Sequence, residues 1–173
     1  MGRITLITGG TRSGKSAHAL NLASHGGPRR AYVATLEPSD DAEMHARIAR
    51  HKEDRPPDFA TIEEPVNVAT ALESLNGRAD VVIVDSLTLW VANLMRIYSG
   101  EHAFRHEAST LAHVMEKMPF DSIVVTDEVG SGIVPDNAVA RRYRDLLGLT
   151  NQRIARSATE VLLMISGIPL KVK

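Results

Sequence analysis

The chain has 173 residues, of which 43% are hydrophobic and 24% are charged, and it contains no cysteine. These proportions are typical of a compact domain rather than of a disordered segment, so we expect a single domain over residues 1–173. The net charge of −1 argues against nucleic acid or an anionic membrane as a partner. The absence of cysteine excludes disulfides and thiolate metal sites.

Short apolar segments alternate with longer segments of helical character along the chain. We expect strands at 4–8, 31–35, 80–85, 122–126 and 160–166. We expect helices at 15–25, 40–54, 66–75, 86–98, 101–117 and 137–156. This alternation predicts an α/β fold with a mostly parallel central sheet and helices on both faces.

The apolar segments bear on location as well as on fold. None approaches the roughly 20 residues that a membrane span requires. The N-terminal sequence "RITLIT" lacks the features of a signal peptide. We therefore expect a cytoplasmic protein without a membrane span.

The first chemical motif, "GGTRSGKS" at 9–16, matches the phosphate-binding pattern G-x-x-x-x-G-K-[ST]. A predicted strand precedes it and a predicted helix follows, so backbone amides at the helix start can point at an anion. Lys15 is expected to reach the terminal phosphates of a nucleoside triphosphate, and Ser16 to hold Mg²⁺. The predicted binding residues of this P-loop are Gly9, Gly10, Thr11, Arg12, Ser13, Gly14, Lys15 and Ser16.

A basic segment, "MHARIARHKEDRP" at 44–56, is the second candidate site. Arg47, His51 and Arg55 are four residues apart, so they share one face of the helix predicted at 40–54. Flanking guanidinium groups suit a polyphosphate and keep His51 neutral, and therefore nucleophilic, near pH 7. A solvated helix surface with weak ion pairs has the same spacing, and spacing alone does not decide between the two.

Acidic residues follow two of the predicted strands. Asp85 ends the apolar segment "DVVIVD", where a Walker B aspartate would hold Mg²⁺ together with Ser16. Asp85 also suits the N-cap of the next helix. Glu63 and Glu64 follow a strand-like "ATI" and suit either a ribose or base contact or the start of a helix.

Several segments together resemble one family, the bifunctional adenosylcobinamide kinase / adenosylcobinamide-phosphate guanylyltransferases of cobalamin biosynthesis. The resembling segments are "ITGGTRSGKS", "AYVATLEPSDDAEMHARIARHKEDRPPDFATIEEP", "VDSLTLWVANL", "TDEVGSGIVPDNAVARRYRDLLGLTNQRIA" and "SGIPLKVK". The patterns "EVGxGIVP" at 128–135 and "RxxRDxxGxxNQ" at 141–152 are more specific than a P-loop. Phe59, Ser86 and Asp127 depart from the family's usual tryptophan, cysteine and asparagine.

The resemblance implies two reactions on one P-loop NTPase-type fold. ATP or GTP would phosphorylate adenosylcobinamide, and GTP would then transfer GMP through an enzyme histidine to adenosylcobinamide phosphate, giving adenosylcobinamide-GDP. The family segment "RIxxHxxxRP" places this histidine at His51, so His51 and Lys15 are the implied catalytic residues. Beyond the P-loop, the implied nucleotide-binding residues are Ala34, Thr35, Leu36, Lys52, Glu53, Asp54, Arg55, Glu63 and Asp85. The resemblance also implies a homotrimer.

Other functions explain part of the sequence. A single-function P-loop kinase without a covalent intermediate accounts for Lys15, Ser16 and Asp85 but leaves the face around His51 without a role. A switch GTPase would carry the guanine-reading N-K-x-D motif, which is absent. Nucleic-acid binding is disfavoured by the balanced charge and by an aromatic content of 4%.

Overall fold

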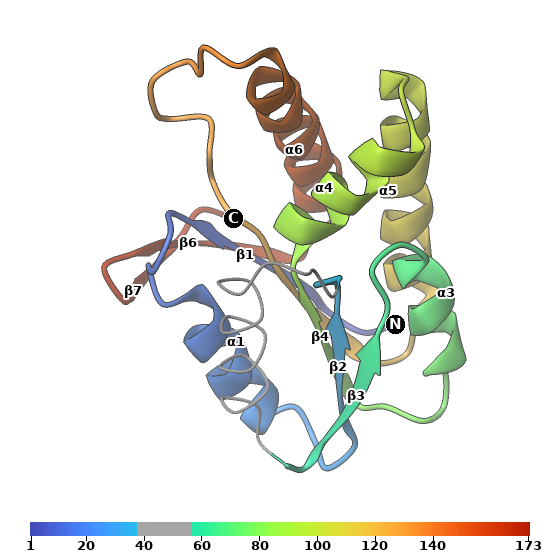
Figure 1. Ribbon diagram of the computed structural model, residues 1–173. Helices are drawn as coiled ribbons and strands as arrows, with labels where there is room; N and C mark the ends of the chain where they lie inside the picture. Colours follow the sequence, from blue (N-terminus) through green and yellow to red (C-terminus); the bar gives the residue numbers. More distant parts are fainter. Residues whose placement is uncertain (38–56) are drawn as a thin grey trace.

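The computed structural model describes residues 1–37 and 57–173, which form a seven-stranded sheet flanked by helices (Figure 1). The strands are β1 (Ile4–Gly9), β2 (Arg30–Ala34), β3 (Phe59–Glu63), β4 (Val81–Asp85), β5 (Asp121–Val125), β6 (Glu160–Ile165) and β7 (Ile168–Lys171). The helices are α1 (Lys15–Ser24), α3 (Val68–Ser74), α4 (Leu87–Ile97), α5 (Glu101–Lys117) and α6 (Ala138–Ser157). The strand order is β3-β2-β4-β5-β1-β6-β7, and only β7 is antiparallel to its neighbour. The expected α/β fold with a mostly parallel sheet is confirmed.

All five predicted strands are present, and so are the predicted helices that fall on described residues. The helix predicted at 40–54 lies outside the described residues. Strand β3 extends the strand-like "ATI", whereas β7 was not predicted. Ser166 and Gly167 have φ values of 51° and 86°, so the chain reverses tightly and β7 pairs with β6.

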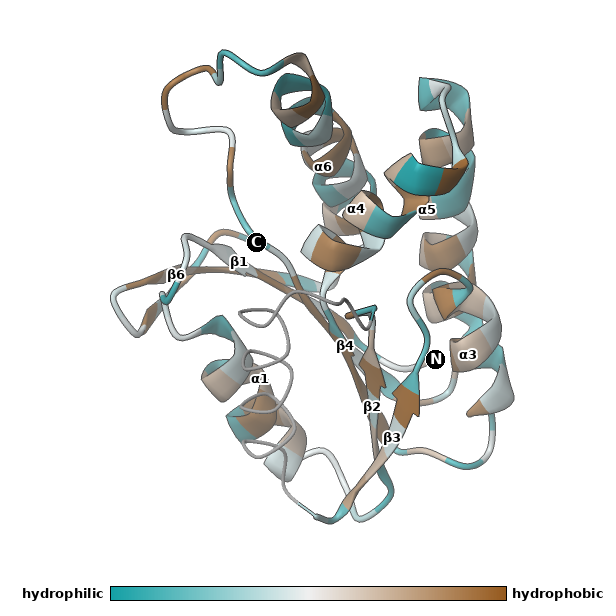
Figure 2. Cartoon of the chain, viewed as in Figure 1, coloured by the Kyte–Doolittle hydropathy of each residue, from teal (hydrophilic) through white to brown (hydrophobic). Residues whose placement is uncertain are grey.

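The core consists of two apolar clusters, one on each face of the sheet. Side chains alternate along a strand, so Val82 and Val84 of β4 contribute to one cluster and Val81 and Ile83 to the other. Helices α3 to α6 cover the first face, and α1 lies on the second (Figure 1). The strands between these layers are predominantly hydrophobic (Figure 2), as expected for a sheet with both faces covered.

The sheet topology brings together the ends of strands that are distant in sequence. Strand β1 lies between β5 and β6, and β4 is the other neighbour of β5. The carboxyl ends of β1, β4 and β5 therefore meet at one edge of the sheet, where ligands of parallel α/β sheets bind. No helix in the described part of the chain is long and apolar enough to cross a membrane.

We expect Leu147→Ala to lower the free energy of unfolding by about 2–5 kcal/mol, because it leaves a cavity between α6 and its neighbours. The Leu147 side chain is fully buried in the larger cluster. Urea denaturation measures the change. Val139→Ala on the same helix is the control, because Val139 is 66% exposed and its truncation should change stability by less than about 0.5 kcal/mol. Equal losses in both variants would contradict the burial of Leu147 in the core.

Candidate nucleotide site at the carboxyl edge of the sheet

The P-loop connects β1 to α1 and packs closely against the end of β6 and the turn between β6 and β7. Gly9 has φ 150°, and a Cβ there would lie 2.5 Å from the carbonyl oxygen of Met164. Gly14, with φ 93°, precedes α1, and a Cβ there would lie 3.3 Å from the Cα of Gly167. The Gly167 amide donates to the Ser13 carbonyl at 3.0 Å. Gly9 therefore allows close approach to β6, and Gly14 allows close approach to the β6–β7 turn.

Lys15, the first residue of α1, is held at the base of the P-loop. Its side chain is only 9% exposed, and its Nζ donates to the carbonyl oxygen of Gly10 at 2.7 Å. The same Nζ forms an ion pair with Asp127 Oδ1 at 2.7 Å. The P-loop lysine is thus turned back toward its own loop and toward the end of β5.

Asp85, at the end of β4, receives two hydroxyl donors on one carboxylate oxygen. Ser16 Oγ donates to Oδ2 at 3.1 Å, and the Tyr32 hydroxyl donates to the same atom at 2.5 Å. The predicted meeting of Ser16 with Asp85 is therefore present. The alternative role of Asp85 as a helix cap is wrong, since Ser86 is the N-cap of α4 and its Oγ accepts from the Leu89 amide.

Asp127 follows β5 and is fixed through its backbone to two helices. Its amide donates to Thr88 Oγ1 of α4 at 2.8 Å, and its carbonyl accepts from Asn151 Nδ2 of α6 at 3.1 Å. The sequence marks Asp127 only as a departure from the asparagine usual in the family, and its contact with Lys15 was not predicted. That contact requires β5 to lie beside β1. The order of strands in a sheet cannot be predicted from local sequence patterns.

Tyr143 of α6 also links this helix to α4. Its hydroxyl donates to the carbonyl oxygen of Thr88 at 3.0 Å. Burial, followed by the nearby Asp127 carboxylate, raises the pKa of Tyr143 above its ordinary value. The phenol consequently stays protonated at neutral pH and acts as a hydrogen-bond donor.

The loop that begins with the motif at 128–135 is held by arginines of α6. Arg144 donates to the carbonyl oxygen of Gly130 at 2.7 Å, and Arg141 donates to that of Pro135 at 2.9 Å. The Glu128 amide, at the start of the loop, donates to Gly9 O at 3.1 Å. The two family-like motifs thus form one unit, in which the helix fixes a loop that starts beside the P-loop.

The end of β2 lies between two of the predicted acidic residues. In the sheet register Ala34 pairs with Asp85 of β4 on one side and with Glu63 of β3 on the other. Thr35 is fully buried, and its hydroxyl donates to the Ser86 carbonyl while accepting from the Ser86 amide, both at 2.8 Å. The Thr35 hydroxyl therefore joins the ends of β2 and β4, whereas the neighbouring residue Leu36 is partly exposed.

The remaining predicted site residues fall outside the described part of the chain. These are His51, Lys52, Glu53, Asp54 and Arg55. The last described residue before them, Glu37, follows the carboxyl end of β2.

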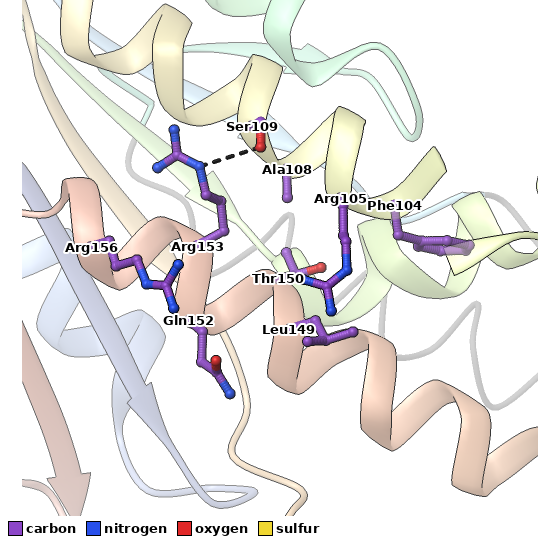
Figure 3. Close-up of a pocket in the computed structure, with 9 residues that line it drawn as sticks. All are labelled: Phe104, Arg105, Ala108, Ser109, Leu149, Thr150, Gln152, Arg153 and Arg156. Carbon is purple, nitrogen blue, oxygen red and sulfur yellow. Dashed lines mark hydrogen bonds between the residues drawn. The ribbon is translucent and has the colours of Figure 1, made fainter. Parts of the chain in front are cut away.

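A separate hollow of about 240 Å³ lies between α5 and α6 (Figure 3). It is lined by Phe104, Arg105, Ala108, Ser109, Leu149, Thr150, Gln152, Arg153 and Arg156. Arg153 spans the two helices by donating to Ser109 Oγ at 3.3 Å. Within residues 1–37 and 57–173, none of the predicted nucleotide-site residues lines this hollow, so it is distinct from the P-loop.

We expect Arg144→Ala to raise amide hydrogen exchange in residues 129–134 up to about tenfold, because each hydrogen bond lost contributes about 0.5–1.5 kcal/mol. Hydrogen–deuterium exchange with mass spectrometry measures this. Arg105→Ala is the control, since the Arg105 guanidinium pairs with Glu101 on its own helix. Unchanged exchange in the Arg144 variant would contradict the conclusion that α6 holds the loop at 128–135 in place.

Comparison with known proteins identifies the family of this chain. The family model described as cobinamide kinase / cobinamide phosphate guanyltransferase matches residues 5–172. The bifunctional adenosylcobalamin biosynthesis protein CobU of Salmonella typhimurium is 38% identical, covering 97% of this chain and 98% of that protein. CobP of Pseudomonas aeruginosa, with the same description, is 37% identical over 97% of this chain and 96% of its own length.

Two solved structures share the fold at low sequence identity. The KaiC-like protein PH0186 of Pyrococcus horikoshii OT3 has a TM-score of 0.51 at 18% identity, covering 93% of this chain and 70% of that one. The flagellar accessory protein FlaH of Methanocaldococcus jannaschii has a TM-score of 0.54 at 14% identity, covering 99% and 78%. Both support the P-loop NTPase-type fold. From its sequence match over nearly its whole length, the chain belongs to the cobinamide kinase / cobinamide phosphate guanyltransferase family.

Proposed function

We propose that the protein phosphorylates adenosylcobinamide with ATP or GTP and then transfers GMP from GTP to adenosylcobinamide phosphate, giving adenosylcobinamide-GDP and pyrophosphate. The observation that carries this proposal is the convergence of Lys15, Ser16 and Asp85 at the carboxyl edge of the sheet. Membership of the family supports the two reactions, and the geometry supports the proposed nucleotide site.

The phosphates would lie against the P-loop. Backbone amides from Gly9 to Gly14 and the N-terminus of α1 favour negative charge, and Lys15 adds an ammonium group at the same place. Because phosphoryl transfer depends on positioning and charge stabilisation, these groups would help to orient the γ-phosphorus toward the acceptor hydroxyl. That hydroxyl would form the new P–O bond as the bond to the leaving nucleoside diphosphate breaks.

The residues present also fit Mg²⁺. Ser16 Oγ and Asp85 Oδ2 are both oxygen donors, 3.1 Å apart. Within residues 1–37 and 57–173 no group of three or more His, Cys, Asp or Glu side chains could hold a metal. A small protein ligand set suits Mg²⁺, which takes its other ligands from phosphates and water. The bound ion would neutralise charge on the phosphates.

The guanylyl transfer would use His51 as a nucleophile. Its imidazole nitrogen forms a bond to the α-phosphorus of GTP as pyrophosphate leaves, and a phosphate oxygen of adenosylcobinamide phosphate then displaces the histidine. Lys52, Glu53, Asp54 and Arg55 would assist in binding the nucleotide, as would Leu36 and Glu63. For Ala34 and Thr35 the contact would be through the backbone, because both side chains are buried.

We further propose a cytoplasmic homotrimer with one domain per chain and no nucleic-acid partner. The single continuous sheet supports one domain, and the net charge of −1 supports the lack of nucleic-acid binding.

The central prediction is that GTP labelled at the α-phosphate labels the protein covalently in the presence of Mg²⁺, and that His51→Ala removes the label. A phosphoramidate survives alkali and is lost in acid, which identifies the linkage. His45→Ala is the matched control from the same segment and should retain the label, whereas removal of Mg²⁺ by a chelator should prevent labelling.

Persistent label in the His51 variant would contradict His51 as the nucleophile. If no protein is labelled while γ-phosphate still passes to a corrinoid, the chain is a single-function kinase. Absence of both reactions would contradict the proposed function as a whole.

A further inference from the structure

The ion pair between Lys15 and Asp127 joins two charged groups of the candidate phosphate site. The Lys15 side chain is 9% exposed and that of Asp127 is 24% exposed, so water screens the pair less than it screens a surface ion pair. An ammonium group has three protons to donate. Asp127 Oδ1 and Gly10 O take two of them, each at 2.7 Å.

Asp127 has little freedom to leave this position. Its backbone amide and carbonyl are bonded to Thr88 of α4 and Asn151 of α6, and the next amide, that of Glu128, is bonded to Gly9. Only the two side-chain torsions of Asp127 can move the carboxylate. When phosphates approach Lys15, the carboxylate therefore stays near them.

We propose that Asp127 is an affinity-determining residue that competes with the β- and γ-phosphates of the nucleotide for Lys15, an inference that rests on the proposed function. A P-loop lysine contacts the β- and γ-phosphates. Binding of a triphosphate must therefore loosen the Lys15–Asp127 pair and leave a carboxylate beside phosphate oxygens of the same charge. Both effects weaken binding and speed the release of a bound di- or triphosphate.

The competition depends on where the ligand carries its charge. A nucleoside monophosphate whose single phosphate occupies the α position has no group at Lys15, so Asp127 should not affect its affinity. A triphosphate carries charge at Lys15, so its binding should be weakened by Asp127. Asp127 thus narrows the difference in affinity between GTP and GMP.

Calorimetric titration of the whole protein tests the proposal with the parent, two variants and two ligands. The ligands are GMP and a GTP analogue with a methylene bridge between the α- and β-phosphates, which His51 cannot cleave, each with Mg²⁺. Asp127→Asn removes the charge but keeps the shape and the backbone hydrogen bonds. Asp121→Asn is the matched control, since Asp121 lies at the opposite end of β5 and pairs with Arg3.

We expect Asp127→Asn to bind the GTP analogue about tenfold or more tightly than the parent, a difference of about 1.4 kcal/mol. Its affinity for GMP should change less than about twofold, and Asp121→Asn should match the parent for both ligands. Equal or weaker binding of the analogue by Asp127→Asn would overturn the proposal, and so would an equal gain for GMP.

These outcomes separate this proposal from the proposed function. If Asp127→Asn binds the analogue no better while the parent still forms the histidine-linked label, only the competition is refuted. If neither the parent nor Asp127→Asn binds the analogue, the competition is refuted together with the role of Lys15 in nucleotide binding.

Discussion

Close contact of the P-loop with the end of β6 and with the β6–β7 turn is the constraint on which the rest of the site depends. A side chain at Gly9 would collide with the carbonyl oxygen of Met164, and one at Gly14 would press against Gly167. The loop can wrap this tightly only because both positions lack a Cβ. That wrap sets the start of α1, and the start of α1 in turn places Lys15 and Ser16 toward the ends of β4 and β5.

Around this loop the sheet positions the acidic residues, and hydrogen bonds with the helices fix the backbone that follows β5. The parallel register brings Asp85 and Asp127 to the same edge from strands that are forty residues apart in sequence. Helices α4 and α6 then hold the backbone after β5 through Thr88 and Asn151. The site is thus built from groups whose backbones are tied down, which is the arrangement that positioning catalysis requires.

Much of this arrangement could be predicted from the sequence, because its signals are local. The P-loop spacing, the apolar strands and the terminal Asp85 each occupy a short stretch whose chemistry is read directly. The pairing of Asp127 with Lys15 could not be predicted, because it depends on β5 lying beside β1. Strand β7 was missed for a different reason, since an apolar segment that includes Gly167 gives no sign of whether the chain continues or reverses. The role of Asp85 as a cap was wrong because Ser86, one residue later, has the extended backbone that an N-cap needs.

The hydrogen bond between Ser13 and Gly167 joins residues from opposite parts of the sequence. A ribosome makes the P-loop early, yet both strands that flank β1 come from residues beyond 120. During synthesis the N-terminal segment therefore has neither its sheet neighbours nor the turn that supports its glycines. Nucleotide cannot assist the early stages of folding. The capacity to hold phosphate arises late, after the segment around Gly167 has emerged and closed the sheet.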